Sequence, residues 1–307
     1  MSAQTTTAVN GKANGAGATK KPQYDPNFTD SVIAATGPKA NPRIRQVIGS
    51  LIRHVHDFAR ENDITVAEWM QGVEFINRCG QMSDDKRNET QLFTDVIGLE
   101  SLVDEITNKL VVGQDYETTK TAILGPFYRK DTPPTENDAS IIKNLPADGQ
   151  VTYMHGIVSD AETGRPLEGI TVEIWQCSTN GLYEQQDPEQ EEFNLRGNFT
   201  TDKNGYYGLY CLKPVPYPVP YDGPAGELLQ FLDRHPYRPA HIHIMAGKGD
   251  EYAPLVTQIF DRKTEYLEND SVFAVKDSLV VDFNELKDNP KAKLELVYDI
   301  KLGAHKS

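Results

Sequence analysis

The sequence has few cysteines and no long apolar segment. Its three cysteines, Cys79, Cys177 and Cys211, lie far apart and form no C-x-x-C pair, so neither a disulfide framework nor a zinc finger is predicted. No uninterrupted apolar run reaches the roughly eighteen residues of a membrane-spanning helix, and the N-terminus has no apolar stretch of secretory-signal length. We therefore expect a cytosolic protein without membrane insertion.

Basic residues are scarce relative to acidic ones. The 307 residues include 31 Lys and Arg against 45 Asp and Glu, which gives a net charge of −14. Such a surface repels a phosphate backbone, so nucleic acid is excluded as a partner. The length predicts one large domain, or a domain with a substantial appendage, and allows a sizeable core.

The first part of the chain has helical spacing. Residues 1–24 contain almost nothing to bury and are predicted to form a disordered tail. Apolar residues then recur with a helical period from Ile44 to Phe58, after Pro42 at the helix start, and again from Val66 to Ile76. A third helix is predicted from Leu92 to Leu110, and it is apolar on too many faces for an ordinary surface helix.

The apolar period changes to two after about residue 120. Strands are predicted at 151–158, 170–175 and 294–301, with Gly-, Asn- and Pro-rich turn signals between them. Helices followed by many short strands indicate an α+β fold rather than an alternating one. We therefore expect a helical N-terminal region over 25–119 and a mainly antiparallel β-sandwich over 120–307, the latter carrying the functional site.

Two histidines form the densest chemical signal. His241 and His243 are two residues apart on an extended segment, so both imidazoles face the same side and can reach one metal ion. Taken alone, H-x-H also occurs on solvated strand faces, which is the more frequent case. His155 and His235 stand apart from the pair, and structural roles are expected for them.

Two tyrosines have unusual surroundings. Tyr183 follows an apolar strand in a polar loop, and Tyr217 is held between alternating prolines that restrict the backbone. Either residue alone is better explained as an amphipathic residue at the edge of the core. Together with the two histidines, however, they form a hard ligand set with two phenolates. That set favours Fe(III) over zinc or copper.

The segments around these four residues resemble one protein family. The chain carries G-L-Y-E-Q-Q-D, then L-R-G-N-F-T-T-D, then Y-P-V-P-Y-D-G-P-A-G, then R-H-P-Y-R-P-A-H-I-H-I. In this order they resemble the intradiol ring-cleaving dioxygenases of the catechol and hydroxyquinol 1,2-dioxygenase group. The resemblance includes I-L-G-P-F-Y at 123–128 and S-L-I-R-H-V-H-D-F-A-R-E-N in the helical region.

The resemblance implies an iron enzyme. Tyr183, Tyr217, His241 and His243 would hold one non-haem Fe(III) per chain, with dioxygen as co-substrate. Tyr217 would leave the metal and take up a proton when an aromatic diol binds, while Tyr183 stays bound. Arg238 would stabilise charge on the substrate ring, and Gln258 would support the site. The ring would open between the two hydroxylated carbons, giving cis,cis-muconate from catechol or maleylacetate from hydroxyquinol in aromatic catabolism.

The resemblance also implies the substrate pocket. An apolar slot suits a flat aromatic ring. The residues expected to form it are Ile123, Leu124, Gly125, Pro126, Phe127, Val219, Pro220 and Val272. Asp104 is expected to meet an additional ring hydroxyl, with a solvent-facing helical acid as the alternative. The G-P-F-Y and Y-P-V-P-Y-D-G-P segments look closer to the hydroxyquinol branch, although catechol-active members carry such segments too, so the sequence favours hydroxyquinol slightly, with catechol as the alternative.

Association with other molecules is implied by the same resemblance. The N-terminal helices would form a homodimer and can enclose a phospholipid, whereas core packing against the sandwich explains the same apolar pattern. Two other functions are compatible with parts of the same sequence pattern. A protocatechuate-type enzyme is disfavoured by the fused helical region, and a metal-free β-sandwich binding module would purify colourless and without iron.

Overall fold

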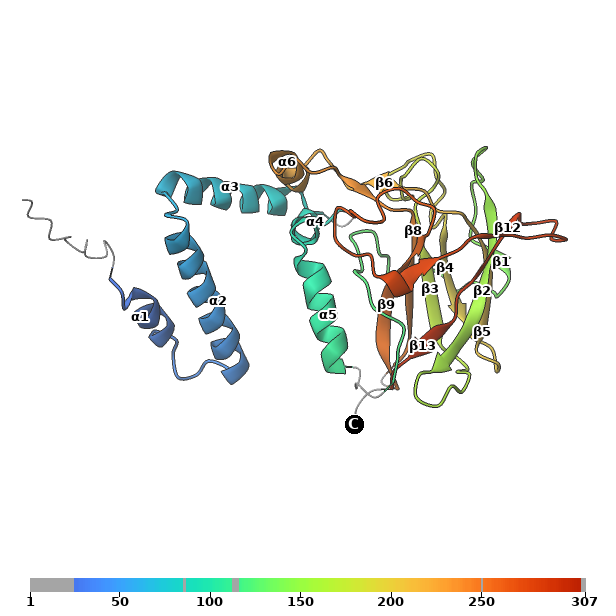
Figure 1. The fold of residues 1–307 in the computed structure, drawn as a ribbon, viewed down its shortest axis with the longest axis horizontal. Helices are drawn as coiled ribbons and strands as arrows, with labels where there is room; N and C mark the ends of the chain where they lie inside the picture. Colours follow the sequence, from blue (N-terminus) through green and yellow to red (C-terminus); the bar gives the residue numbers. More distant parts are fainter. Residues whose placement is uncertain (1–24, 85–86, 112–115, 250, 305–307) are drawn as a thin grey trace, which may run out of the picture. The chain divides into compact units, whose positions relative to one another are not determined.

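The structure is a computed structural model that describes residues 25–84, 87–111, 116–249 and 251–304 (Figure 1). The tail predicted for residues 1–24 lies outside the described residues. The chain divides into two compact units, Met1–Gln71 and Gly72–Ser307. In the described part, no helix is long and apolar enough to cross a membrane.

The first unit contains helices α1 (Phe28–Ala34) and α2 (Pro42–Glu61) and the start of α3 (Val66–Met82). Helix α2 begins where the sequence predicted, because Asn41 accepts hydrogen bonds from the first-turn amides and Pro42 occupies the first turn. His56 of α2 stacks on Phe28 of α1 with ring centroids 5.5 Å apart. The two helices therefore pack through an aromatic contact, while the apolar stripe of α2 stays exposed.

The third predicted helix is in fact two helices, so that prediction was wrong in detail. Helix α4 (Glu89–Val96) ends before Gly98, and α5 (Leu99–Val111) follows it. Gly98 has φ = +73°, in the left-handed region where glycine is favoured and where helices commonly end. The break lets α4 bury Leu92 and Val96, while Leu102 of α5 remains half exposed.

Two sheets form the sandwich of the second unit (Figure 1). The six-stranded sheet contains β1 (Ala139–Ser140), β2 (Val151–Asp160), β5 (Tyr206–Leu212), β11 (Asn284–Glu285), β12 (Leu294–Val297) and β13 (Ile300–Leu302). The five-stranded sheet contains β3 (Thr171–Trp175), β4 (Arg196–Thr200), β8 (His241–Lys248), β9 (Tyr252–Asp261) and β10 (Val280–Val281). A small ladder of β6 (Tyr217–Pro218) and β7 (Tyr237–Arg238), helix α6 (Pro224–Phe231) and a short helix, η1 (Asp277–Leu279), belong to the same unit, as do α4 and α5.

The α+β prediction is confirmed, and the sheets are mixed rather than wholly antiparallel. The strand predicted over 294–301 is interrupted, and its two parts, β12 and β13, both pair with β2 in parallel. The interruption occurs where the carbonyl of Tyr298 approaches Gly156, at which a Cβ atom would lie only 1.9 Å from that oxygen. The core lies between the sheets and includes Met154, Phe199, Ile174 and Ile242, all almost fully buried.

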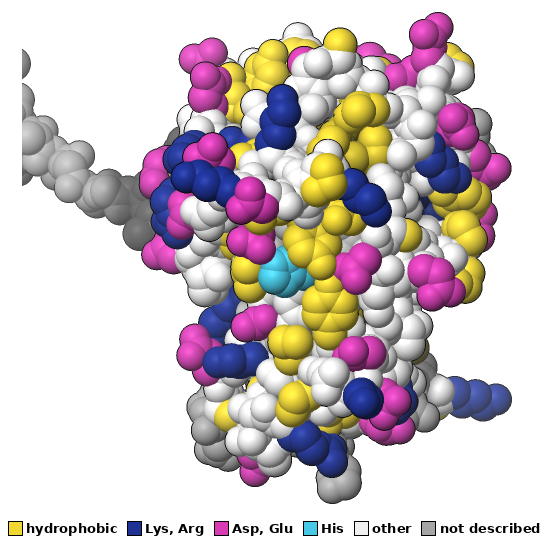
Figure 2. Space-filling model, turned by 90° about the vertical axis from the view of Figure 1, so that its right-hand side faces the viewer, with side chains coloured by type: hydrophobic (Ala, Val, Ile, Leu, Met, Phe, Trp, Pro, Cys, Tyr) yellow, Lys and Arg dark blue, Asp and Glu magenta, His cyan; other side chains and the backbone are white. Residues whose placement is uncertain are grey.

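The outer face of β2 and β5 carries an aromatic cluster. Figure 2 shows the face of the molecule on the side of β2 and β5. Hydrophobic side chains gather there around one histidine, with charges of both signs around them. The Tyr153 and Tyr206 hydroxyls both donate to Asp138 Oδ1, at 2.7 and 2.5 Å. His155 contacts Glu295 through Nε2 at 3.0 Å. These polar groups satisfy one another, in agreement with the structural role expected for His155.

Candidate metal centre

Strand β8 positions the two histidines. His241 and His243 alternate with Ile242 along β8 and are 1% and 2% exposed. His243 pairs across the sheet with Trp175 of β3 on one side and Gln258 of β9 on the other. Residues opposite one another in a ladder project from the same face, so these side chains form one row. The Trp175 indole stacks on the His243 ring at 4.8 Å and holds its orientation.

The two tyrosines reach the same place from different segments. Tyr217 lies on β6 and pairs with Arg238 of β7, which fixes one phenol beside the guanidinium. Tyr183 follows a turn at Gly181, where φ is +77° and a Cβ atom would approach Tyr217 Cβ to 3.0 Å. Glycine is therefore required at that turn. Both phenols are buried, Tyr183 at 1% and Tyr217 at 4% exposure.

The four side chains converge on one point. The Tyr183 and Tyr217 hydroxyl oxygens are 3.2 Å apart, and Tyr217 OH lies 3.3 Å from His241 Nε2. His241 Nε2 lies 3.2 Å from His243 Nε2. Donor atoms at such spacings match neighbouring corners of a coordination polyhedron with bonds of about 2.0–2.2 Å. The arrangement fits a single metal ion.

The protonation states suit metal binding. His241 Nδ1 lies 2.7 Å from the carbonyl of Pro239, which identifies Nδ1 as the protonated atom and leaves Nε2 unprotonated, as an acceptor that Arg238 Nη1 contacts at 3.0 Å. Burial, reinforced by Arg238, holds the pKa of His241 well below its usual range. Burial likewise lowers the pKa of His243, with His241 as the next cause. Both imidazoles are therefore neutral at physiological pH, which is the form that binds a metal.

The phenols point to a hard cation of high charge. Burial raises the pKa of Tyr217 to about 12 and that of Tyr183 well above its ordinary value. Only a strong positive charge at the centre would make both phenolates favourable there. Among the described residues, no group of three or more His, Cys, Asp and Glu side chains could hold a metal. A metal at this point would therefore use phenol oxygens as well as the two imidazoles, and such a donor set suits Fe(III).

Arg238 lies beside the four donors and is held by three partners. Its guanidinium donates to both carboxylate oxygens of Asp270 at 3.1 Å, to Gln258 Oε1 at 2.7 Å and to His241 Nε2 at 3.0 Å. Gln258 in turn donates to the carbonyl of Ile123 at 2.7 Å. The structure thus brings Arg238 and Gln258 to the site, as the sequence predicted. Asp270 was missed, because an acid in a long loop carries no local signal.

The predicted pocket segment lies directly against the donors. Gly125 has φ = +74°, and a Cβ atom there would approach His243 Cε1 to 3.2 Å. The Phe127 ring stacks on Tyr183 with centroids 4.5 Å apart, and Leu124 packs against the same cluster. Ile123, Val219 and Val272 share a second buried cluster. The flanking Pro126 and Pro220 are partly exposed.

Asp104 is not brought to the donors. Its carboxylate accepts hydrogen bonds from Thr121 Oγ1 at 2.7 Å and from Lys276 Nζ at 3.0 Å, which occupies it in an ion pair. The acid near the site is instead Asp95 of α4, close enough to interact electrostatically with Arg238 and Asp270. The sequence offered one signal for it, an acid three residues after Leu92 on the apolar face of α4.

Asp95 is a buried carboxyl group that keeps its proton. It is 1% exposed, and burial raises its pKa to about 10, with a hydrogen bond to Glu100 adding to the effect. Its Oδ1 atom has no hydrogen-bond partner among the described residues. Glu100 also accepts from the backbone amide of Leu124 at 3.1 Å, which ties α5 to the pocket segment. A neutral carboxyl group with one oxygen unpartnered in the described part of the chain therefore lies on α4, the helix that contributes Leu92 and Val96 to the cluster containing Ile123.

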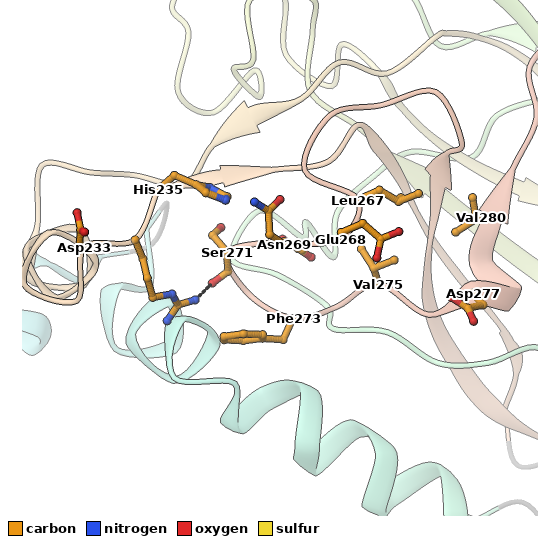
Figure 3. Close-up of a pocket in the computed structure, with 12 residues that line it drawn as sticks. Asp233, His235, Leu267, Glu268, Asn269, Ser271, Phe273, Val275, Asp277 and Val280 are labelled. Atoms are coloured by element: carbon orange, nitrogen blue, oxygen red, sulfur yellow. Dashed lines mark hydrogen bonds between the residues drawn. The ribbon is translucent and has the colours of Figure 1, made fainter.

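The loop that carries Asp270 also borders a surface cavity of about 600 Å³ (Figure 3). Arg234 donates to the carbonyls of Ser271 and Val96, both at 2.7 Å, and its guanidinium lies 4.6 Å from the centre of the Phe273 ring. This arginine joins the end of α4 to the loop. None of the four converging donors lines the cavity, so it is separate from the candidate metal centre.

Comparison with known proteins agrees with this geometry. Residues 123–304 match the family described as dioxygenase, and residues 41–114 match catechol dioxygenase N terminus. The intradiol ring-cleavage dioxygenase prcA of Aspergillus niger is 51% identical, covering 92% of this chain and 90% of that protein. Catechol 1,2-dioxygenase of Candida albicans is 48% identical, covering 91% and 93%.

A solved structure supports the same assignment. Hydroxyquinol 1,2-dioxygenase from Pseudomonas putida superimposes with a TM-score of 0.79 at 35% identity, covering 91% of this chain and 98% of that one. The family resemblance read from the sequence is confirmed, and membership implies a non-haem iron enzyme. Because the matches extend over nearly the whole chain, this protein belongs to the intradiol ring-cleavage dioxygenase family and is an enzyme of that family.

Proposed function

We propose that this enzyme binds one Fe(III) through Tyr183, Tyr217, His241 and His243 and cleaves catechol, with dioxygen, to cis,cis-muconate. The observation that carries the proposal is the convergence of two buried phenols and two neutral imidazoles, in which successive donor atoms lie 3.2–3.3 Å apart. The choice of catechol, instead of the hydroxyquinol slightly favoured by the sequence segments, rests on the 48% identity to a catechol 1,2-dioxygenase, compared with 38% to a hydroxyquinol 1,2-dioxygenase. Both oxygen atoms of dioxygen enter the product, so no external reductant is needed.

The ferric ion would supply Lewis acidity and accept electron density from the diol. The chain's own residues do the rest of the work. Tyr217 is held beside Arg238 and can take up a proton from an incoming diol hydroxyl. Arg238 is a fixed cation beside His241 and can stabilise negative charge developing on the ring. Ile123, Val219 and Val272 form a buried apolar surface that orients the ring and excludes water.

The visible absorption spectrum of the purified, iron-loaded protein tests this proposal first. Tyrosinate bound to Fe(III) gives a broad charge-transfer band, so we expect a coloured protein with one iron per chain. Adding catechol without oxygen should shift the band, because the diol changes the ligand set. A protein that stays colourless after iron loading would remove the four-ligand assignment and favour a metal-free binding module.

A second candidate substrate is hydroxyquinol, which is favoured by Asp95. The third hydroxyl of hydroxyquinol can pair with the partnerless Oδ1 atom of this neutral carboxyl group. Asp104, the residue expected from the sequence, is occupied by Lys276. We therefore assign to Asp95 the role expected for Asp104.

Substitution of Asp95 separates the two substrates. In Asp95→Ala we expect kcat/KM for hydroxyquinol to fall roughly 5- to 150-fold. This corresponds to a loss of about 1–3 kcal/mol of transition-state stabilisation from one buried hydrogen bond. The value for catechol should change much less. Asp104→Ala is the matched control, and steady-state kinetics on both substrates are the measurement. An equal loss on both substrates in Asp95→Ala would refute a specificity role.

We also propose a homodimer that uses the N-terminal helices. Apolar side chains are exposed on α2, at Ile44, Leu51 and Phe58, and on α5, at Leu102 and Ile106. A second copy of the chain, with or without an enclosed phospholipid, would cover such surfaces. Sedimentation velocity should give twice the chain mass of 34.3 kDa, and lipid extraction with mass spectrometry tests for phospholipid. A monomer at micromolar concentration would contradict the dimer.

A further inference from the structure

A buried arginine lies behind the candidate metal centre. Arg196 begins β4 and pairs with Trp175 of β3, which pairs in turn with His243 of β8. Arg196 therefore belongs to the same cross-sheet row as a proposed ligand and projects from the same face. It is 4% exposed. A cation so thoroughly removed from water requires strong partners.

Glu184 fixes the arginine in place. Arg196 Nε lies 2.8 Å from both carboxylate oxygens of Glu184, and Arg196 Nη2 donates to Gln185 Oε1 at 2.5 Å. Glu184 is the residue that follows Tyr183, so the ion pair and the proposed ligand share one short segment. The Arg196 guanidinium lies 5.8 Å from the centre of the Tyr183 ring, within the range of a cation–π contact.

A second arginine completes the array on its outer side. Arg129 Nη1 donates to Glu184 Oε1 at 3.2 Å and also pairs with Asp131 and Glu192. Its side chain is 19% exposed, and its guanidinium lies over Phe193 rather than over Tyr183. Arg129 and Arg196 thus share the Glu184 carboxylate, but only Arg196 is shown in contact with the tyrosine ring. This difference provides a matched control.

We infer that Arg196 is a positioning residue for Tyr183, acting through its fixed charge and its ion pair with Glu184. The inference rests on the proposed function, because it concerns the tyrosine expected to stay on the iron. A fixed cation beside the ring lowers the energy of the phenolate electrons, which sets the energy of their transfer to a ferric ion. The Glu184 ion pair holds the cation and the Tyr183 backbone in one geometry.

The charge-transfer band of the iron-loaded protein tests this inference. In Arg196→Met we expect the band to move to longer wavelength, because the phenolate electrons are no longer stabilised. Iron affinity should fall about 10–100-fold, as is typical when support of a ligand is removed. Arg129→Met should leave the band in place. Spectroscopy and competition with an iron chelator measure the two effects without reference to turnover.

A double variant keeps the test decisive if Arg196→Met does not fold. Glu184→Gln with Arg196→Met removes the whole ion pair and leaves no unpaired charge from it. The double variant should therefore fold more readily than Arg196→Met alone. The shift to longer wavelength should persist. A folded double variant with the wild-type band and iron affinity would show that the pair only braces the fold, and would overturn the inference. A wild-type protein without any band would instead overturn the proposed function, and this inference with it.

Discussion

His243→Ala is expected to abolish iron binding and ring cleavage. His243 supplies one of the four converging donors, and its Nε2 lies 3.2 Å from that of His241. Alanine leaves three donors and an open position next to Gly125. Activity on catechol should fall by more than about 10³-fold, beyond the 10–100-fold typical of residues that only support a ligand. Iron content by metal analysis and initial rates on catechol are the measurements.

A histidine elsewhere on the sandwich is the matched control. His155 lies on the outer face of the sheet and contacts Glu295. His155→Ala should retain one iron per chain, the visible band and a near wild-type rate, because exposed pairs of this kind contribute little. Tyr217→Phe should also abolish turnover, since it removes a donor oxygen and the proposed proton acceptor. A His243→Ala protein that keeps iron and a near-normal rate would refute the ligand assignment.

Arg238→Met is expected to lower kcat by about 10²–10³-fold, the range for removing one group that stabilises charge in the transition state. The guanidinium is fixed by Asp270 and Gln258, so it offers its charge without reorganisation. Iron should still bind, because Arg238 is not one of the four proposed metal ligands. Single-turnover rates with catechol and dioxygen separate this chemical step from substrate binding.

The same substitution has a separate cost in stability. Asp270 is 5% exposed, and loss of its partner leaves a buried carboxylate partly unpaired, which costs about 3–5 kcal/mol. Arg238→Lys keeps a positive charge beside Asp270, so it should be more stable than Arg238→Met. It cannot reproduce the arginine contacts to Asp270, Gln258 and His241, so its reaction should remain slow. Arg262→Met is the control, because Arg262 pairs with Asp282 at the surface. A fast, stable Arg238→Met variant would remove this residue from the mechanism.

The four proposed iron ligands became candidates at the sequence level because each carries a local signal. His241 and His243 alternate on a strand, and the period of two places both on one face whatever the rest of the fold does. Tyr183 and Tyr217 became candidates through the ordered segments that resemble the family. Helix α2 was predicted near its observed start because Pro42 favours the first turn of a helix, and the structure adds a cap at Asn41.

Other features depend on neighbours that are distant in the sequence. Asp104 and Asp95 are both helical acids, and only packing shows that the first is paired with Lys276 while the second is buried near Arg238. The break at Gly98 was missed, because glycine is tolerated within a helix and the apolar pattern continues across it. The interruption between β12 and β13 arises from the close approach of Tyr298 to Gly156.

The sequence by itself determined the helical and sandwich regions, the candidate ligands and the family, because periodicity and ordered motifs are local properties of the chain. Only the tertiary structure decided which charges support the site. Asp270 meets Arg238 across 32 residues, and Arg196 reaches Tyr183 through the register of β4 on β3. Burial sets the energy of these groups, and burial belongs to the packed chain rather than to any segment of it.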